Sequence, residues 1–211
     1  PEHTVTVNSF YISETEVTQK QYREVMTTIP KFNPDGEDYP ANYVRFNDAA
    51  RFCNNLSKIM ELEPCYTIEG EGGREELIKI TCNFTKNGFR LPTDAEWEYA
   101  ARAGSNLLAP SPIGNYAWFS SNAGASITPF KVRQKQPNAF GLYDMNGNVE
   151  EWVWDWYSWD YYGQSNSSKN PTGPSSGETR IARGGSYRND ESLVLNTSKV
   201  SRYQVDRQLY L

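Results

Sequence analysis

Hydrophobic positions in the first part of the chain recur with two different periods, and these periods predict its elements. Residues 4–13 alternate between polar and β-branched or aromatic side chains, a pattern that predicts a strand. Thr18 followed by Gln21 has the spacing of a capping box, so we expect a short helix from there to Met26. Residues 28–43 contain three prolines and a glycine, and we expect a loop.

A second helix is expected from Asn47-Asp48 onward, because its apolar residues return at steps of three and four. These residues are Ala49, Phe52, Cys53, Leu56 and Met60. Cys53 in this stripe is interpreted as a small core residue rather than a reactive thiol. Residues 65–69 and 77–82 form two strand-like runs around a glycine-rich tip, which predicts a β-hairpin. Cys65 and Cys82 lie at its outer ends, and both a disulfide and two free thiols remain open.

A third helix is expected after Thr93, which forms a capping box with Glu96. Its inward residues are Trp97, Ala100 and Ala101, and Gly104 ends it. Beyond Gly104 the helical period disappears, and Gly, Pro, Asn and Ser separate short aromatic runs. Helices followed by irregular β-structure predict an α+β fold with little regular secondary structure. A length of 211 residues fits one domain over 1–211.

Composition removes several classes of chemistry. The single histidine, His3, leaves no internal imidazole for a nucleophile–histidine pair. Three cysteines at these spacings do not make a zinc site of the Cys/His type. Lys and Arg number 21 against 26 Asp and Glu, a net charge of −5, so we expect no nucleic-acid partner. No apolar run has the length of a membrane span, so no transmembrane segment is expected in this chain.

The segment 144–151, Asp-Met-Asn-Gly-Asn-Val-Glu-Glu, combines turn-forming residues with carboxylates on both sides. Carboxylate and carbonyl oxygens that converge on one point suit a hard cation such as calcium. The spacing is not that of an EF-hand loop. From the residues alone, a turn whose Asn and Asp side chains satisfy their own backbone is equally open.

Tryptophan at every second position of 152–156 places three indoles on one face of a strand. Trp152 is expected in the core. For Trp154 and Trp156, burial and a wall on which a sugar or peptide could stack both remain open. Glu150/Glu151 and Asp155/Asp160 could each be read as the acid pair of a glycosidase, but no other feature supports that chemistry.

Five blocks, in order, give the chain a resemblance to the formylglycine-generating enzyme (sulfatase-modifying factor) family. They are Phe10-Tyr11-Ile12 with Glu14-Thr15-Glu16-Val17-Thr18 and Tyr22; Val44 with Asn47-Asp48-Ala49-Ala50 and Cys53; 90–104 (RLPTDAEWEYAARAG); 137–149 (PNAFGLYDMNGNV) with Glu151-Trp152; and Arg183-Gly184-Gly185-Ser186-Tyr187. The resemblance implies a modified C-type-lectin-like fold.

The resemblance also implies a structural calcium ion at the 144–151 turn. Carried over by position, its ligands are the side chains of Asp144 and Glu151 and the carbonyls of Gly147 and Val149. The family's other calcium site falls near Asn122 and Ala123, where no acidic partner is clearly in register, so no calcium site is assigned there.

The same resemblance argues against the family's oxidase activity. Members that oxidise a substrate cysteine carry a Cys-x4-Cys pair after the Gly-Gly-Ser-Tyr element, and this pair binds copper. Here Asn189 and Val194 stand at those positions, and no cysteine follows Cys82. Soft Cu(I) needs thiolate ligands, so we expect no copper and no enzyme activity of this kind.

This fold also occurs in the variable proteins of bacterial diversity-generating retroelements, and the tail of this chain most resembles theirs. Residues 187–211 would then be a variable ligand-binding segment that binds an unknown protein or surface ligand, a role suited to a bacterial cell surface. The expected binding residues are those that should not be core: Tyr187, Arg188, Asn189, Asp190, Tyr203, Gln204 and Asp206, with Trp154 and Trp156 beside them. A divergent oxidoreductase or maturation enzyme and a sensor or interaction module are the alternatives.

Overall fold

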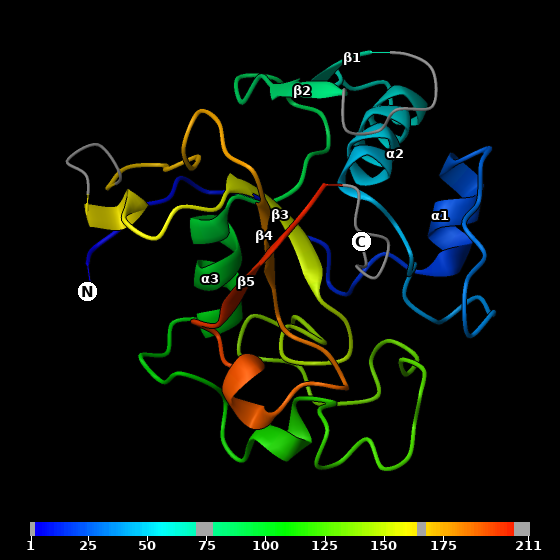
Figure 1. Ribbon diagram of the computed structural model, residues 1–211, viewed down its shortest axis with the longest axis vertical. Helices are drawn as coiled ribbons and strands as arrows, with labels where there is room; N and C mark the ends of the chain where they lie inside the picture. Colours follow the sequence, from blue (N-terminus) through cyan, green and yellow to red (C-terminus); the bar gives the residue numbers. More distant parts are fainter. Residues whose placement is uncertain (1–2, 71–77, 164–167, 205–211) are drawn as a thin grey trace.

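Three α-helices, five short strands and three one-turn 3₁₀ helices carry the regular structure within residues 3–70, 78–163 and 168–204, the ranges that this computed structural model describes (Figure 1). In chain order they are α1 (Gln19–Val25), α2 (Phe46–Ile59), β1 (Tyr66–Glu69), β2 (Lys79–Cys82), α3 (Asp94–Arg102), η2 (Ile113–Asn115), β3 (Glu151–Trp156), η3 (Tyr161–Gly163), β4 (Arg180–Arg183), η4 (Glu191–Leu193) and β5 (Lys199–Arg202). Long irregular connections join them, so the expected α+β class is confirmed.

Both expected capping boxes are present, and they explain where α1 and α3 begin. Thr93 accepts a hydrogen bond from the Glu96 amide, and the Glu96 carboxylate accepts one from the Thr93 amide at 2.8 Å. Thr18 and Gln21 form the same reciprocal pair at α1. These bonds satisfy amide groups that the first helical turn leaves without partners. Ala103 ends α3 in the left-handed conformation, with φ of 46°.

Two details of the expected pattern are wrong. Residues 4–13 do not form a strand, because only Thr6 makes a bridge, to Lys169. Phe10 and Ile12 instead pack against the apolar cluster beneath α3, so the alternation reflects a segment with one buried side and no sheet partner. Met60 caps α2 rather than continuing its buried stripe, and its side chain is exposed.

The hairpin β1–β2 forms where it was expected, with Tyr66 opposite Cys82. Cys65 lies one residue outside this register, and its amide oxygen accepts a hydrogen bond from Asn83. Its thiol points to the carbonyl of Gly88 at 3.2 Å. Cys65 and Cys82 are both free thiols, as is the buried Cys53.

A three-stranded antiparallel sheet in the order β3–β4–β5 separates two apolar clusters (Figure 1). Trp152 and Ala182 pack on one side, with α1, α2 and the hairpin. Val153 and Ile181 pack on the other, with Trp97 of α3. Successive residues of a strand point to opposite faces, so a sheet with both faces covered is apolar at consecutive positions. β5 therefore forms one edge of the sheet. No helix in the described ranges is long and apolar enough to cross a membrane.

A buried ionic cluster joins α3 to the sheet. Arg183 of β4 donates to Asp94 at 2.5 Å and to Glu98 at 2.9 Å, and Lys199 of β5 lies 3.4 Å from the second oxygen of Asp94. Arg183 and Asp94 are both almost fully buried. A buried ion pair of this kind is costly to break, because removal of one partner leaves the other charge unpaired in a medium of low polarity.

Asp155 of β3 completes this ionic cluster as a neutral acid. One of its oxygens accepts a hydrogen bond from the Asp94 amide at 2.8 Å. Burial and the nearby charge of Asp94 raise the pKa of Asp155 to about 8, whereas the cations Arg183 and Lys199 hold the pKa of Asp94 below its usual value. Asp94 therefore carries the negative charge, and Asp155 holds a proton at neutral pH.

We therefore expect opposite outcomes from two Asp→Asn substitutions. Asp94→Asn should lower the free energy of unfolding by about 3–5 kcal/mol, because Arg183 loses its buried counter-charge. Asp155→Asn should not lower it at neutral pH, because an amide can still accept the bond from the Asp94 amide and needs no proton to be neutral. Urea unfolding of both variants measures the two values, and equal losses would contradict the assignment of the charge to Asp94.

The pH dependence of the same variants gives a second check. A raised pKa in the folded state stabilises the fold at low pH, and this contribution is lost as pH rises from about 4, the ordinary value, through about 8. The Asp155→Asn variant lacks that loss. Its stability relative to the native protein should therefore increase between pH 5 and pH 8.

Candidate functional site

The turn at 144–151 is held tightly by left-handed backbone conformations. Asp144, Gly147 and Asn148 have φ of 58°, 78° and 54°. A side chain on Gly147 would meet the Trp118 carbonyl oxygen at 2.0 Å, so only glycine fits there. The Gly147 amide donates to the Gly184 carbonyl at 2.8 Å, which connects the turn to the segment that leads into the tail.

Two carboxylates of this turn, Asp144 and Glu151, lie in surroundings that disfavour their charge. Asp144 accepts one hydrogen bond, from the Arg133 amide at 2.8 Å, and its other oxygen has no partner. Glu151 accepts a hydrogen bond from the Trp97 indole at 3.1 Å. Burial raises the pKa of Asp144 to about 6 and that of Glu151 to about 7. In this surrounding the two groups resist carrying charge without a cation.

Glu16 is a third carboxylate here, and sequence reasoning gave it no role. It is buried, and one oxygen accepts a hydrogen bond from Asn148 at 2.9 Å while the other has no partner. Burial, followed by the charges of Asp144 and Glu151, raises the pKa of Glu16 well above its usual range. Glu16 is part of one family-like block, but nothing in the sequence indicates that this block folds against a turn far along the chain.

The oxygen atoms around this turn decide whether a cation fits it. Within the described ranges, no three acidic, thiol or imidazole side chains form a cluster that could hold a metal ion by themselves. A cation would therefore need backbone oxygens as well. The carbonyl oxygens of Met145 and Val149 lie beside Gly184, 3.5 and 3.6 Å from a Cβ placed there. Asp144 and Glu16 each keep one oxygen without a partner, and carboxylate and carbonyl oxygens are the ligands that calcium takes.

In the region that corresponds to the family's second calcium site, the Asn122 side chain finds its hydrogen-bond partners within its own turn. Asn122 accepts a hydrogen bond from the Phe119 amide at 2.9 Å, and its amide group donates to the Ala117 carbonyl at 2.8 Å. Its side chain is thus used within the turn.

The first residues of the tail divide into a buried and an exposed set. The expectation that Tyr187 is displayed is wrong: its ring is buried and its hydroxyl donates to the Ile127 carbonyl at 2.7 Å. Arg188 and Asp190 are exposed. Asn189 is half-buried, and its side-chain oxygen accepts hydrogen bonds from the Ser186 amide and hydroxyl at 2.7 and 2.8 Å. Asn189 therefore holds the loop rather than projecting from it.

The middle of the tail is anchored in the interior. Val194 is fully buried against Ala117 and Phe119. Asn196 is buried too, and its side-chain oxygen accepts a hydrogen bond from Asn146 at 3.0 Å. The amide group of Asn146 also donates to the Val194 carbonyl at 2.6 Å. These contacts fix the tail backbone directly after η4, none of whose side chains is buried.

The end of the described tail is less enclosed. Tyr203 is 59% exposed, in agreement with the expectation of a displayed ring. Gln204 is half-buried, and its carbonyl accepts a hydrogen bond from the Phe46 amide. Asp206, also expected in the binding set, lies outside the described residues.

Trp154 and Trp156 surround a buried cation rather than a free space. The guanidinium of Arg180 lies 3.6 Å from the centre of the Trp156 ring and 4.6 Å from that of Trp154, and it also contacts Phe46. The other face of Trp154 stacks on Tyr66. Burial lowers the pKa of Arg180 to about 9. Cation–π contacts occupy these rings, so they do not line the surface of the tail.

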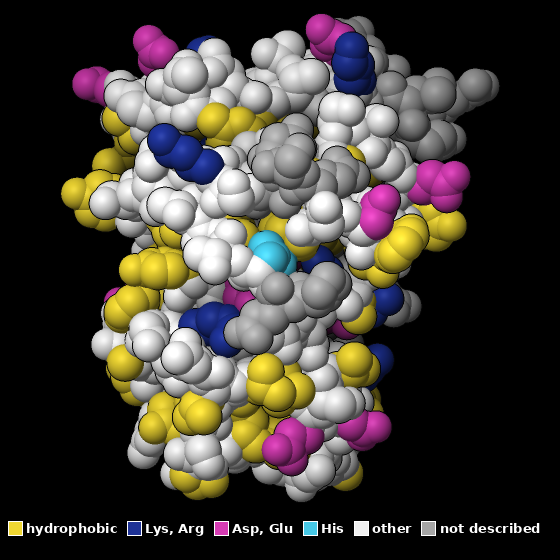
Figure 2. Space-filling view, turned by 90° about the vertical axis from the view of Figure 1, so that its left-hand side faces the viewer, with side chains coloured by type: hydrophobic (Ala, Val, Ile, Leu, Met, Phe, Trp, Pro, Cys, Tyr) yellow, Lys and Arg dark blue, Asp and Glu magenta, His cyan; other side chains and the backbone are white. Residues whose placement is uncertain are grey.

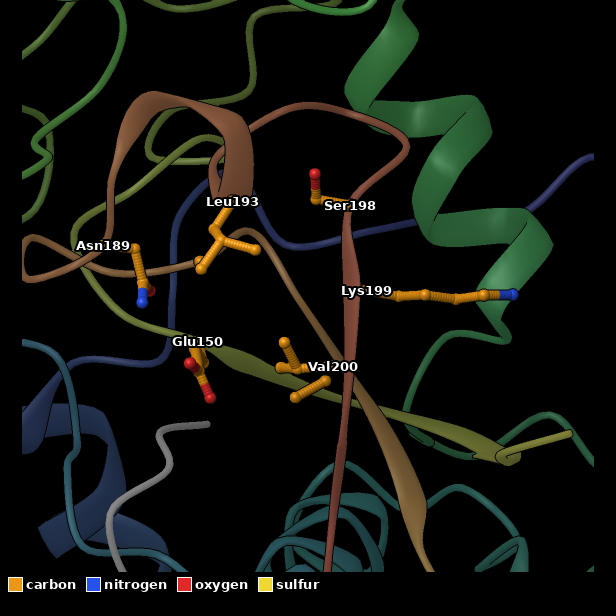
Figure 3. Close-up of a pocket in the computed structure, with 8 residues that line it drawn as sticks. Glu150, Asn189, Leu193, Ser198, Lys199 and Val200 are labelled. Carbon is orange, nitrogen blue, oxygen red and sulfur yellow. The ribbon is translucent and has the colours of Figure 1, made fainter. Parts of the chain in front are cut away.

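A very small cavity lies beside the described part of the tail. The cavity between η4 and the sheet measures about 10 Å³ and is lined by Glu150, Asn189, Leu193, Lys199 and Val200, among others. Figure 3 shows Leu193 directed from η4 toward Glu150 and Val200, with Lys199 directed away toward α3. A larger cavity of about 380 Å³ lies beside Tyr161, lined by residues 170–175, and shares no lining residue with the first.

The chain matches the family of sulfatase-modifying factor enzyme 1-like domains over residues 1–208. This match covers nearly the whole sequence and agrees with the α+β fold. The chain therefore belongs to that family, whose fold is of the formylglycine-generating-enzyme type.

The relatives of this chain include a protein named as a chaperone and another named as an enzyme. The chain is 38% identical over 182 residues to the chaperone protein LppX of Paenibacillus barcinonensis, a match that covers 73% of this chain and 65% of that protein. It is 28% identical to the formylglycine-generating enzyme of Streptomyces coelicolor, across 97% of this chain and 74% of the enzyme. The chain thus spans less than two-thirds of the length of the chaperone.

Among solved structures, variable protein 1 of Treponema denticola is similar over 99% of this chain and 85% of its own, with 35% identity and a TM-score of 0.88. The fold and the family are therefore established, and similarity to a variable protein is established with them.

The division of the tail into buried and exposed residues predicts where substitutions are tolerated. Val194→Ala should lower the free energy of unfolding by about 2 kcal/mol, because it leaves a cavity beside Ala117 and Phe119. Glu191→Ala, on the exposed η4, serves as the matched control and should change it by less than about 0.5 kcal/mol. Thermal or urea unfolding measures both, and a loss at Glu191 as large as that at Val194 would contradict the division.

Proposed function

We propose that this protein is a non-catalytic ligand-binding protein that displays its tail on a rigid lectin-type scaffold, as a retroelement variable protein does. The observation that carries the proposal is the similarity to a variable protein over nearly the full chain, combined with a tail whose frame is buried and whose η4 side chains are exposed. Arg188, Asp190 and Tyr203 are the exposed members of the expected binding set. Placement at a bacterial surface is part of the same proposal.

The two positions that the family resemblance assigns to copper-binding cysteines support a role without this catalysis. The side-chain oxygen of Asn189 accepts hydrogen bonds from Ser186, and the side chain of Val194 is buried in the core. Neither offers a thiolate, and the cysteines of this chain are all at position 82 or earlier. Cu(I) held by thiolates, which the family oxidation requires, has no ligands among these residues.

Peptide oxidation tests the non-catalytic part of the proposal. The protein is incubated with a Cys-x-Pro-x-Arg peptide, copper and oxygen, and the mass of the peptide is measured by mass spectrometry. We expect no formylglycine product, while a formylglycine-generating enzyme treated in parallel converts the peptide. Formation of formylglycine by this protein would contradict the proposal and show that it is an oxidase.

The proposal includes a structural calcium ion at the 144–151 turn. Asp144 and Glu151 would hold it through their side chains, with the carbonyls of Gly147 and Val149. The unpartnered oxygen of Asp144 supports this, because a buried carboxylate oxygen without a hydrogen bond is costly unless a cation neutralises it. Bound calcium would stabilise the fold and fix the segment that precedes the tail.

Chelation tests the calcium site. Addition of EGTA should lower the melting temperature by about 5–10 °C, the effect of a ligand at about a hundredfold excess over its dissociation constant in a chain of this size. Asp144→Asn should melt lower and no longer respond to EGTA. Asp160→Asn, at an exposed position, should keep the response. A native protein whose melting temperature is unchanged by EGTA has no such site.

A further inference from the structure

We infer that the cavity beside η3 is a binding site of its own and that its ligand is a neutral saccharide. The cavity measures about 380 Å³ and is lined by Tyr161 and by residues 170–175. Sites for small molecules measure about 300–1,000 Å³, so this space has room for one. None of its lining residues belongs to the tail or to the 144–151 turn, and the inference does not depend on the proposed function.

The two walls of this cavity are held from outside it. On the η3 side, the Tyr162 hydroxyl donates a hydrogen bond to Asp94 of the buried ionic cluster at 2.9 Å. On the loop side, the Asn170 amide donates to the Thr6 carbonyl at 2.8 Å, and the Asn170 side-chain oxygen accepts a bond from the Asn8 amide at 2.7 Å. A site whose walls are fixed in advance loses little entropy when a ligand binds.

Gly173 brings the loop close to the sheet. Its φ is 76°, and a Cβ placed on it would lie 2.8 Å from the Cβ of Asp155 in β3, so only glycine fits. The Tyr161 hydroxyl lies against the backbone of Gly173 and Thr172, and its ring packs edge-on against Tyr162. Tyr161 and the loop therefore enclose one preformed space.

The groups that face this space are polar and uncharged. Among the described residues, no charged side chain lines the cavity. The NH₂ group of Asn170 and the hydroxyls of Thr172 and Ser175 have no hydrogen-bond partner in the described part of the chain. Phosphates and carboxylates are bound by Arg or Lys, which are missing from this lining. An apolar molecule would leave the polar groups unpaired, whereas a molecule with several hydroxyls would satisfy them.

Rings complete the lining and favour a saccharide over a peptide. The rings of Tyr161, Pro171 and Pro174 offer flat apolar surfaces, on which the C–H face of a sugar can pack while its hydroxyls bond to the polar groups. An extended peptide is bound through a row of backbone N–H and C=O groups. Pro171 and Pro174 have no N–H group, so this loop cannot supply such a row.

Figure 2 looks onto this side of the molecule. His3, the single histidine, stacks on Tyr162 of η3 with ring centres 4.3 Å apart, and it therefore marks the place of η3 in the view. Backbone and uncharged polar side chains, drawn white, cover much of the surface around it. The surroundings of the cavity thus share the neutral, polar character of its lining.

Saturation-transfer NMR on the full chain tests the ligand class. The neutral probes are glucose, galactose, N-acetylglucosamine and maltose, and the comparison probes are glucose 6-phosphate and triglycine. We expect transfer of saturation to at least one neutral saccharide and none to either comparison probe. Transfer to none of the four saccharides, or to glucose 6-phosphate or triglycine, would overturn the neutral saccharide as ligand.

Two variants test the place of binding. Asn170→Asp keeps the oxygen that accepts the bond from Asn8, but it loses the NH₂ group and adds a charge. Tyr161→Ala removes one wall. Each should weaken the affinity for the bound saccharide by at least about tenfold, and Asn170→Asp should leave the melting temperature unchanged.

Tyr203→Ala is the matched control, because Tyr203 is a 59% exposed tyrosine in the tail, directly after β5. In Figure 1 this end of β5 lies beside α2, on the other side of the molecule from η3. The control should bind the saccharide as the native protein does. A saccharide bound equally well by the native protein and by both site variants would lie elsewhere and would overturn this site. Either result leaves the proposed function of the tail standing.

Discussion

The buried pair of Arg183 and Asp94 is the interaction on which most of this structure depends. It joins the first turn of α3 to the central strand β4, and Lys199 extends it to β5. Arg183 also donates to the carbonyls of Asn196 and Ser198, so one side chain ties the helix, the sheet and the tail together. In a fold with so little regular structure, such a centre replaces the long hydrogen-bonded ladders that larger sheets use.

The tail inherits its rigidity from this centre. The Arg183, Asn146 and Asn196 contacts fix the backbone at 194–198, and Asn189 closes the loop at its start. Between these fixed points, η4 carries side chains that contribute little to the interior. A backbone held at both ends can present different side chains at intervening positions without a change of fold, which is the requirement for a diversified binding surface. Asn189, through its bonds to Ser186, is a structural element of this loop.

Local rules predicted the elements that have local causes. The capping boxes at Thr18 and Thr93, the hairpin around 71–77 and the core position of Trp152 follow from residues near each other in sequence. The strand expected at 4–13 failed because alternation reports one buried side and cannot report whether a partner strand exists. The roles of Tyr187 and Arg180 were missed for a related reason: a tyrosine or arginine in a polar segment becomes buried only when distant groups, here the Ile127 carbonyl and the rings of β3, receive it. The same holds for Glu16, which reaches the 144–151 turn across most of the chain.

The central claim is that buried tail residues form a frame and exposed ones form a display. A scan of all single substitutions at 187–204, scored by the amount of folded protein, tests this claim most directly. Positions 188, 190, 191, 193 and 203 should accept most side chains, whereas 187, 189, 194 and 196 should accept few. A pattern of tolerance unrelated to burial, or one in which 188, 190 and 191 are as restricted as 194 and 196, would contradict it.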